Sequence, residues 1–152
     1  MDPLAKLLPP GNVLVDLDVS SKKRAFEQAG QLFERNQGLN RNTIFGSLFA
    51  REKLGSTGLG QGVAIPHGRI KGLREAVGAL IKLKNPVPFD APDGMPVSLV
   101  FILLVPEQAT DLHLHILGEL AQLFSDPAMR TTLASQPDAS AILQAIGNWN
   151  AS

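Results

Sequence analysis

The hydrophobic pattern of the chain predicts two helices near its start. In the segment 22–37, alanine, leucine and phenylalanine residues recur three or four positions apart, as on one buried face of a helix. Ser20 or Ser21 can accept a hydrogen bond from the first turn, and Gly38 can end the helix. The segment 40–55 has a similar apolar stripe and also ends in a glycine, so we expect a second helix there.

Shorter apolar patterns further along the chain predict strands. Residues 12–19 alternate weakly and are expected at a sheet edge, residues 62–67 predict a short strand, and residues 76–84 predict a longer one. Residues 97–105 are almost all apolar, which is typical of a central strand covered on both faces. The segment 85–96 is rich in proline and is expected to form loops and turns.

Helical spacing returns in the last third of the chain. Residues 111–125 predict one helix. Asp126, and then Asp138 or Ser140, can begin two further helical segments that end near Trp149.

The order of these elements indicates the fold class. Residues 1–11 contain three prolines and are expected to form an irregular arm. After this arm, helices alternate with strands around at least one doubly covered strand. We therefore predict one α/β domain over residues 1–152, with a mixed sheet flanked by helices on both faces.

Composition and charge exclude several classes of protein. With 14 basic and 14 acidic residues the formal net charge is zero, which argues against a nucleic-acid-binding protein. The chain has no cysteine, so it can form no disulfide or thiolate metal site, and we expect a cytoplasmic protein. The most apolar run, residues 97–105, is too short to cross a bilayer, so no membrane insertion is expected.

The most unusual stretch is "STGLGQGVAIPHGR", residues 56–69, in which four glycines surround one histidine. Pro66 favours an extended Ile65, which predicts a stiff support for His67 at the end of a strand. The glycines leave space around the imidazole, and exposed backbone N–H groups can bind anionic oxygens. Together with neighbouring cations, this set suits a phosphoryl group. The alternative is a structural histidine in an ordinary glycine-rich loop, and the stretch does not match the nucleotide-binding templates.

Two further histidines lie in the predicted helix 111–125. His113 and His115 point about 200° apart, so they cannot both face one site. His113 shares a face with Leu117 and is expected to point inward, whereas His115 shares a face with Glu119 and is expected at the surface. A zinc pair on this helix would need a different spacing, and no carboxylate is obviously placed to complete a site with His67. We therefore predict no metal and no cofactor.

Two long segments resemble a known family. "REKLGSTGLGQGVAIPHGR" and "FDAPDGMPVSLVFILLVPEQATDLHLHIL" are similar to the IIA domains of the phosphoenolpyruvate-dependent phosphotransferase system, fructose/mannitol class. The resemblance runs from about Val13 to Ile146 and is strongest for the nitrogen-regulatory branch. It implies a mixed sheet of about five strands with helices on both faces.

The resemblance also implies the site residues. His67 corresponds to the phosphorylated histidine, His113 to a second active-site histidine, and Arg51 to a basic residue near the site. Four further residues are expected to cradle the phosphoryl group, namely Ser56, Thr57, Gly58 and Gly60.

The function implied is that of a phosphohistidine carrier. The resemblance implies a small phosphocarrier protein of the HPr type as donor and regulatory targets, such as potassium-transport or sensor-kinase systems. One alternative is a sugar-specific IIA component that passes phosphate to a IIB domain. The others are a module that regulates by docking alone, against which His67, His113 and Arg51 count, and a metal-dependent enzyme, which the poor ligand set disfavours.

Overall fold

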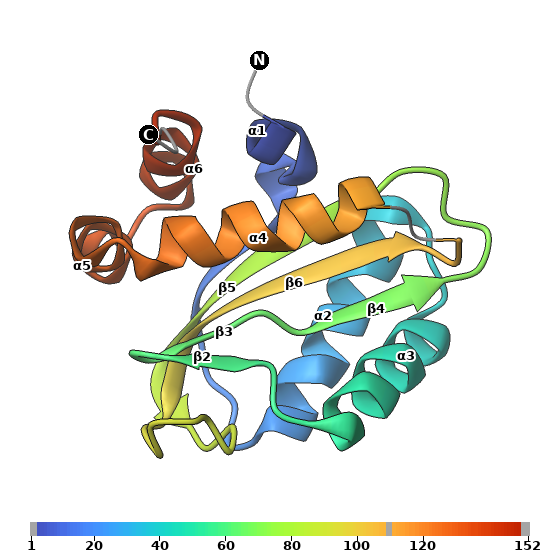
Figure 1. Ribbon diagram of the computed structural model, residues 1–152, viewed down its shortest axis with the longest axis horizontal. Coiled ribbons are helices and arrows are strands. Elements are labelled where there is room, and N and C mark those ends of the chain that lie inside the picture. The colour runs from blue at the N-terminus through green and yellow to red at the C-terminus, as the bar shows by residue number, and fades with distance from the viewer. Residues whose placement is uncertain (1–2, 109–110, 150–152) are drawn as a thin grey trace.

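The computed structural model describes residues 3–108 and 111–149, and a six-stranded mixed sheet runs through its centre (Figure 1). The strands are β1 (Val13–Leu17), β2 (Gly58–Gly60), β3 (Val63–Ala64), β4 (His67–Ile70), β5 (Val77–Val87) and β6 (Val97–Pro106). Strand order along the sheet is β1-β5-β6-β3-β2, and β4 also pairs with β6. β5 and β6 are antiparallel, whereas β1 is parallel to β5 and both β3 and β4 are parallel to β6.

Helices cover both faces of the sheet, as predicted (Figure 1). They are α1 (Pro3–Leu7), α2 (Lys22–Gln37), α3 (Arg41–Leu54), α4 (Asp111–Ser125), α5 (Pro127–Ser135) and α6 (Ala139–Gly147), with a 3-10 turn at Pro10–Asn12. α2 and α3 pack on one face, and α1, α4, α5 and α6 contribute to the core on the other. The fold is therefore the predicted α/β architecture.

Strand β6 separates the two cores because its side chains alternate between them. Phe101, Leu103 and Val105 belong to the core under α4, whereas Ile102 and Leu104 belong to the core under α2 and α3. All five are buried, so the prediction of a central strand covered on both faces is confirmed.

The predicted signals for the ends of α2 are confirmed. The Ser21 hydroxyl accepts a hydrogen bond from the Arg24 N–H at 3.1 Å, and Gly38 adopts the left-handed conformation with φ of 71°. In the same way, α3 begins after Asn40, whose side chain accepts from the Thr43 N–H.

The prediction of an irregular arm over residues 1–11 is wrong for residues 3–7, which form α1. Proline is tolerated in the first turn of a helix, where its missing N–H would have no intrahelical partner, so Pro3 does not prevent this helix. Leu4, Leu7 and Leu8 are buried in the core under α4, and this burial stabilises the short segment. Residues 1 and 2 lie outside the described residues.

Two predicted strand boundaries are also wrong. The single strand expected over 62–67 is part of three short strands between residues 58 and 70, so His67 begins a strand rather than ending one. Pro66 has no N–H to donate to a neighbouring strand, and it separates β3 from β4 along the same edge of β6. β5 continues to Val87, into the segment expected to be loop. With β2, β3 and β4 counted separately, the sheet has six strands, close to the expected number of about five.

Candidate functional site

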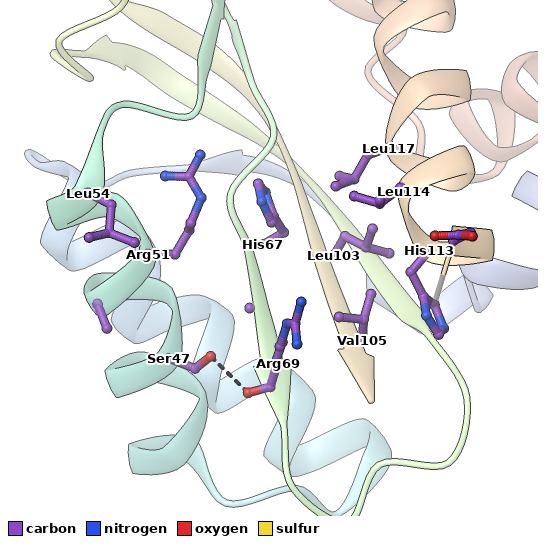
Figure 2. Close-up of a pocket in the computed structure, with 13 residues that line it drawn as sticks. Ser47, Arg51, Leu54, His67, Arg69, Leu103, Val105, His113, Leu114 and Leu117 are labelled. Atoms are coloured by element: carbon purple, nitrogen blue, oxygen red, sulfur yellow. Dashed lines mark hydrogen bonds between the residues drawn. The ribbon is translucent and has the colours of Figure 1, made fainter. Parts of the chain in front are cut away.

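A cavity of about 500 Å³ lies at the edge of the sheet formed by β4, between α3 on one side and α4 on the other. Figure 2 shows His67 near its middle, with Arg51 on the α3 side and His113 on the α4 side. Each of these three predicted residues lines the cavity. The tertiary fold thus brings together side chains that are far apart along the chain.

The strand geometry of β4 points His67 into this cavity. His67 pairs with Leu103 of β6, and side chains opposite one another in a sheet project to the same face. Leu103 lies in the core under α4, so His67 faces the α4 side of the sheet and is half-buried there. The next residue, Gly68, faces α3.

A hydrogen bond sets which ring nitrogen of His67 is available. The Nδ1 atom lies 2.9 Å from the carbonyl oxygen of Ile65. Since a carbonyl oxygen can only accept, Nδ1 carries the hydrogen, and the neutral ring has its lone pair on Nε2. Nε2 is therefore the nucleophilic atom of His67.

Gly68 is required by the close approach of α3 to β4. A Cβ atom at this position would lie 2.4 Å from the Ser47 hydroxyl oxygen and 3.2 Å from its Cβ. The same hydroxyl donates a hydrogen bond to the Arg69 carbonyl oxygen at 3.0 Å, which ties α3 to the strand (Figure 2). The glycine allows α3 to carry Arg51 to the cavity.

Arg51 lies in the last turn of α3 beside the cavity. Its guanidinium donates to the Gly55 carbonyl oxygen at 2.8 Å, which holds the side chain near the end of the helix. Arg51 and His67 also line a smaller cavity of about 220 Å³ together with Ser56, Thr57 and Gly58. All the predicted site residues except Gly60 therefore line a cavity beside His67.

The hydroxyl groups of Ser56 and Thr57 bind the protein itself. Ser56 donates to the Phe89 carbonyl oxygen at 2.6 Å, and Thr57 donates to the Glu52 carboxylate at 2.6 Å. A hydroxyl has one hydrogen to donate, so neither hydroxyl donates into the cavity in this arrangement. Both residues stabilise the segment that joins α3 to β2.

The two glycines predicted to cradle a phosphoryl group also have structural contacts. The Gly58 N–H donates to the Ser56 hydroxyl oxygen, and a Cβ at Gly58 would lie 2.9 Å from Ala91. Gly60 has φ of 90° and faces Asp93, away from the cavities that His67 lines. Both positions need glycine for the path of the chain.

The two histidines of α4 point in the directions that the helical spacing predicts. His113 is half-buried and lines the large cavity with Leu114 and Leu117. The His115 side chain is 73% exposed and lies 3.4 Å from the Glu119 carboxylate. Only His113 of this pair shares the cavity with His67.

Arg69 also lines the cavity, although the sequence analysis did not include it among the site residues. It lies two positions after His67 in β4 and so projects to the same face. That alternation was the signal available in the sequence. Its use requires that a strand begins at His67, whereas the strand predicted over 62–67 ends there.

The cavity combines cations and imidazoles with little negative charge. Arg51 and Arg69 contribute positive charge, and Asp111 is the one carboxylate among the described residues that line it. Within residues 3–108 and 111–149, no three His, Cys, Asp or Glu side chains are grouped as a metal ion would require. The cations and imidazoles of the cavity suit an anionic group presented to Nε2 of His67.

In the part of the chain that the structure describes, no helix is both long enough and apolar enough to span a bilayer.

Comparison with known sequences identifies the family of the chain. The family model "Phosphoenolpyruvate-dependent sugar phosphotransferase system, EIIA 2" matches residues 6–149. The chain is 46% identical over 144 residues to a nitrogen regulatory protein of Pseudomonas aeruginosa, with 94% of each chain covered. These matches span nearly the whole chain, including both walls of the cavity.

Solved structures show the same fold. The chain superimposes on nitrogen regulatory protein IIA-Ntr from Neisseria meningitidis with a TM-score of 0.90 and 52% identity, covering 95% of this chain and 99% of that one. A complex of enzyme IIA mannitol and phosphorylated enzyme IIB mannitol from Escherichia coli matches with a TM-score of 0.79 at 18% identity, covering 94% and 100%. At that identity the second likeness concerns the fold alone. From the family match and the sequence identities, the chain belongs to the EIIA 2 family of the phosphoenolpyruvate-dependent sugar phosphotransferase system.

Proposed function

We propose that this protein is a histidine phosphocarrier that accepts a phosphoryl group on Nε2 of His67 from an HPr-type protein. It acts as a nitrogen-regulatory IIA signalling protein of the cytoplasm. The observation that carries the proposal is the hydrogen bond from Nδ1 of His67 to the Ile65 carbonyl oxygen, because it leaves the Nε2 lone pair beside a basic cavity.

The reaction is a reversible exchange of one nitrogen–phosphorus bond for another. Nε2 of neutral His67 attacks the phosphorus in line, and the nitrogen–phosphorus bond of the donor phosphohistidine breaks, returning the electron pair to the donor ring. Nδ1 of His67 keeps its hydrogen throughout. As positive charge develops on the ring, the hydrogen bond to the Ile65 carbonyl oxygen becomes charge-assisted and stronger.

The walls of the cavity supply the charge that the transferring group needs. Its equatorial oxygens share negative charge in the transition state, so catalysis depends on positioning and on nearby donors. Arg51 lies on the α3 side and His113 on the α4 side of His67 (Figure 2). We assign both to contact the phosphoryl oxygens, with His113 also stabilising the phosphorylated form.

The rim of the cavity suits a macromolecular donor. Leu54 is 85% exposed on the α3 side and Leu114 is 67% exposed on the α4 side. Exposed apolar residues that flank a polar site are typical of protein-binding surfaces. They would bring a partner's phosphohistidine over His67.

The regulatory role is preferred over sugar transport because of sequence identity. Identity is 46% and 52% to the two nitrogen regulatory proteins and 18% to the mannitol enzyme. Transfer to a IIB domain during transport of fructose or mannitol is the alternative. The catalytic chemistry at His67 would be the same in both roles.

The proposal is tested by intact mass after incubation with a phosphorylated HPr-type protein. The wild type should gain about 80 Da, the mass of one phosphoryl group, and His67→Ala should gain nothing. The adduct should be lost in acid and stable in base, as expected for a phosphorus–nitrogen bond. An acid-stable adduct would instead indicate Ser56 or Thr57, and an unchanged mass of the wild type would reject the carrier role.

The regulatory assignment needs a separate test of binding. Immobilised wild type and His67→Ala are each exposed to purified candidates, namely a potassium-transport regulator, a sensor kinase and a IIB domain. Binding of a regulator that changes when His67 is phosphorylated supports the regulatory role. Efficient transfer of phosphate to the IIB domain alone supports the sugar-transport alternative.

A further inference from the structure

A buried carboxylate, Glu52, lies in the last turn of α3 beside the segment that joins this helix to β2. The Glu52 side chain is only 4% exposed, and it forms an ion pair with the Lys22 amino group at 3.0 Å. Burying a charge is costly unless it is paired and hydrogen-bonded. Glu52 does not line either cavity beside His67, so it does not contact the transferring phosphoryl group directly.

Both oxygens of Glu52 bind the same residue of the glycine-rich stretch. Oε1 accepts the Thr57 hydroxyl hydrogen at 2.6 Å, and Oε2 accepts the Thr57 backbone N–H at 3.1 Å. Lys22 donates to Oε2 as well. One carboxylate thus holds the backbone and the side chain of Thr57 together.

Backbone hydrogen bonds continue from Thr57 to the imidazole. The Thr57 carbonyl oxygen accepts the Ile65 N–H at 3.0 Å, and the Ile65 carbonyl oxygen lies 2.9 Å from Nδ1 of His67. Ile65 is therefore hydrogen-bonded through both its backbone N–H and its carbonyl oxygen. The carbonyl that selects the hydrogen-bearing nitrogen of His67 depends on the position of Thr57.

We propose that Glu52 is a positioning residue for the phosphoryl acceptor, acting through Thr57 and Ile65 to hold the His67 ring with its lone pair on Nε2. The inference deepens the proposed function, because it concerns the acceptor of that same reaction. Glu52 itself touches neither donor nor phosphoryl group.

A carboxylate is the side chain that fits this position. Three donors converge on it, from Lys22 and from the N–H and hydroxyl of Thr57. A glutamine has the same shape but only one acceptor oxygen and no charge, so its amide N–H would face the Thr57 hydroxyl, which would have to change from donor to acceptor. Substitution by glutamine should therefore weaken the contacts to Thr57, because the charge-assisted bonds from Lys22 and Thr57 become neutral.

The same segment also locates Arg51. The backbone carbonyl oxygen of Glu52 accepts the Gly55 N–H at 3.2 Å, and the Gly55 carbonyl oxygen accepts from the Arg51 guanidinium. Movement of the 52–57 segment would displace the acceptor ring and a cation together. Displacements of about 1 Å can slow a reaction roughly 100-fold.

The experiment measures the His67 tautomer in unphosphorylated Glu52→Gln. Nitrogen-15 NMR of the imidazole rings reports which nitrogen carries the hydrogen, and His67→Ala assigns the signals. The wild type should show one neutral form with the hydrogen on Nδ1. Glu52→Gln should show a mixture of the two neutral forms.

The second measurement is single-turnover transfer from a phosphorylated HPr-type protein, well below the midpoint of thermal unfolding. Glu52→Gln should slow transfer about 10-fold to 100-fold at saturating donor, with the half-saturating donor concentration unchanged. Glu52 is buried and the substitution removes no exposed side chain of the rim, so a change in apparent affinity alone would contradict a positioning role.

Glu34→Gln is the matched control. Glu34 also binds one backbone N–H and one cation, since its carboxylate accepts from the N–H and the guanidinium of Arg41 at 3.0 and 2.8 Å. These bonds join α2 to the start of α3, at the opposite end of that helix from Arg51. This variant should keep the wild-type tautomer and the wild-type transfer rate.

Thr57→Val provides a milder variant in case Glu52→Gln does not fold. It removes only the hydroxyl and keeps the Lys22–Glu52 ion pair, and it should shift the tautomer in the same direction with a smaller loss of rate. A variant at either position that folds and keeps one tautomer with the hydrogen on Nδ1 overturns the proposal, whatever its thermal stability. The tautomer is measured without phosphate, so this result is independent of whether His67 accepts a phosphoryl group.

Discussion

The two walls of the cavity hold their histidines in different ways. On the β4 side, His67 is hydrogen-bonded to Ile65, follows a proline, and precedes a glycine packed against Ser47. On the α4 side, His113 lies in the first turn of a helix, and its neighbours Leu112 and Leu114 are 63% and 67% exposed. The His67 ring is thus fixed by the interior of the protein, whereas His113 is half-buried in the first turn of a helix, between two exposed leucines.

This difference matches the roles that we propose for the two residues. An acceptor must present one nitrogen in line with the phosphorus, and that requirement favours an orientation held before the donor arrives. A second histidine that contacts phosphoryl oxygens has several acceptable positions, because three oxygens share the charge. Substitutions on the β4 wall should therefore cost more than those on the α4 wall.

The largest effect is expected from Gly68→Ala. The added Cβ would meet the Ser47 side chain and force β4 and α3 apart, which should lower the free energy of unfolding by about 1–3 kcal/mol. Because His67 and Arg51 lie on the two separated elements, transfer should also slow about 100-fold. Urea unfolding and single-turnover transfer measure the two quantities.

Gly30→Ala is the control for this substitution. A Cβ at Gly30 would lie 2.9 Å from the Arg41 carbonyl oxygen, so a similar loss of stability is expected. That contact is at the start of α3 and far along the helix from Arg51, so transfer by the folded protein should be unaffected. Equal transfer rates for Gly68→Ala and Gly30→Ala would show that transfer does not depend on the position of β4 against α3.

A smaller effect is expected from His113→Ala. Removal of one donor from the α4 wall should slow transfer about 10-fold without changing the urea midpoint, because the residue is only half-buried. His115→Ala, whose side chain points to solvent two residues away, should transfer at the wild-type rate. If His113→Ala matched that rate, the α4 wall would have no part in the chemistry.

The smallest effect on stability is expected at the turn between β2 and β3, in the middle of the glycine-rich stretch. The N–H groups of Gln61 and Met95 donate to the carboxylate of Asp93 and hold its pKa below the ordinary value of 3.8. The ionised Asp93 carboxylate therefore contributes fully to the free energy of unfolding above the pKa that it has in the unfolded chain. This contribution is lost as pH falls through its lower pKa in the folded protein.

Asp93→Asn tests this contribution. Its urea midpoint should be slightly below that of the wild type at neutral pH, and the two midpoints should converge in acid, where the wild-type carboxyl is protonated. Transfer at neutral pH should be unchanged, since Asp93 lies away from the cavity lined by His67. A difference in midpoint that stays constant down to strongly acidic pH would contradict this account.

Local signals account for the parts of the fold that were predicted correctly. Ser21 and Gly38 act through a hydrogen bond or a backbone angle within a few residues, so they can be recognised without the rest of the chain. The unbroken apolar run of β6 likewise reports its own burial on both faces. The opposite directions of His113 and His115 follow from helix geometry alone.

The wrong predictions involve choices made by distant neighbours. Whether residues 3–7 are irregular or helical depends on the core that buries Leu4 and Leu7, which is built largely from the second half of the chain. The break between β3 and β4 depends on the partner β6, against which Pro66 cannot donate a hydrogen bond. Nothing in either segment alone carries that information.

For the site, the sequence by itself supplied a histidine at position 67 in a stretch of glycines that follows a proline, and the resemblance of its motifs to the IIA domains selected His113 and Arg51. Motifs of this kind can be recognised without knowledge of the fold. Only the tertiary structure decided that Arg69 faces the cavity and that the Ser56 and Thr57 hydroxyls bind the protein. The physical reason is that each side-chain hydrogen takes a single partner, and the fold decides which acceptor is within reach.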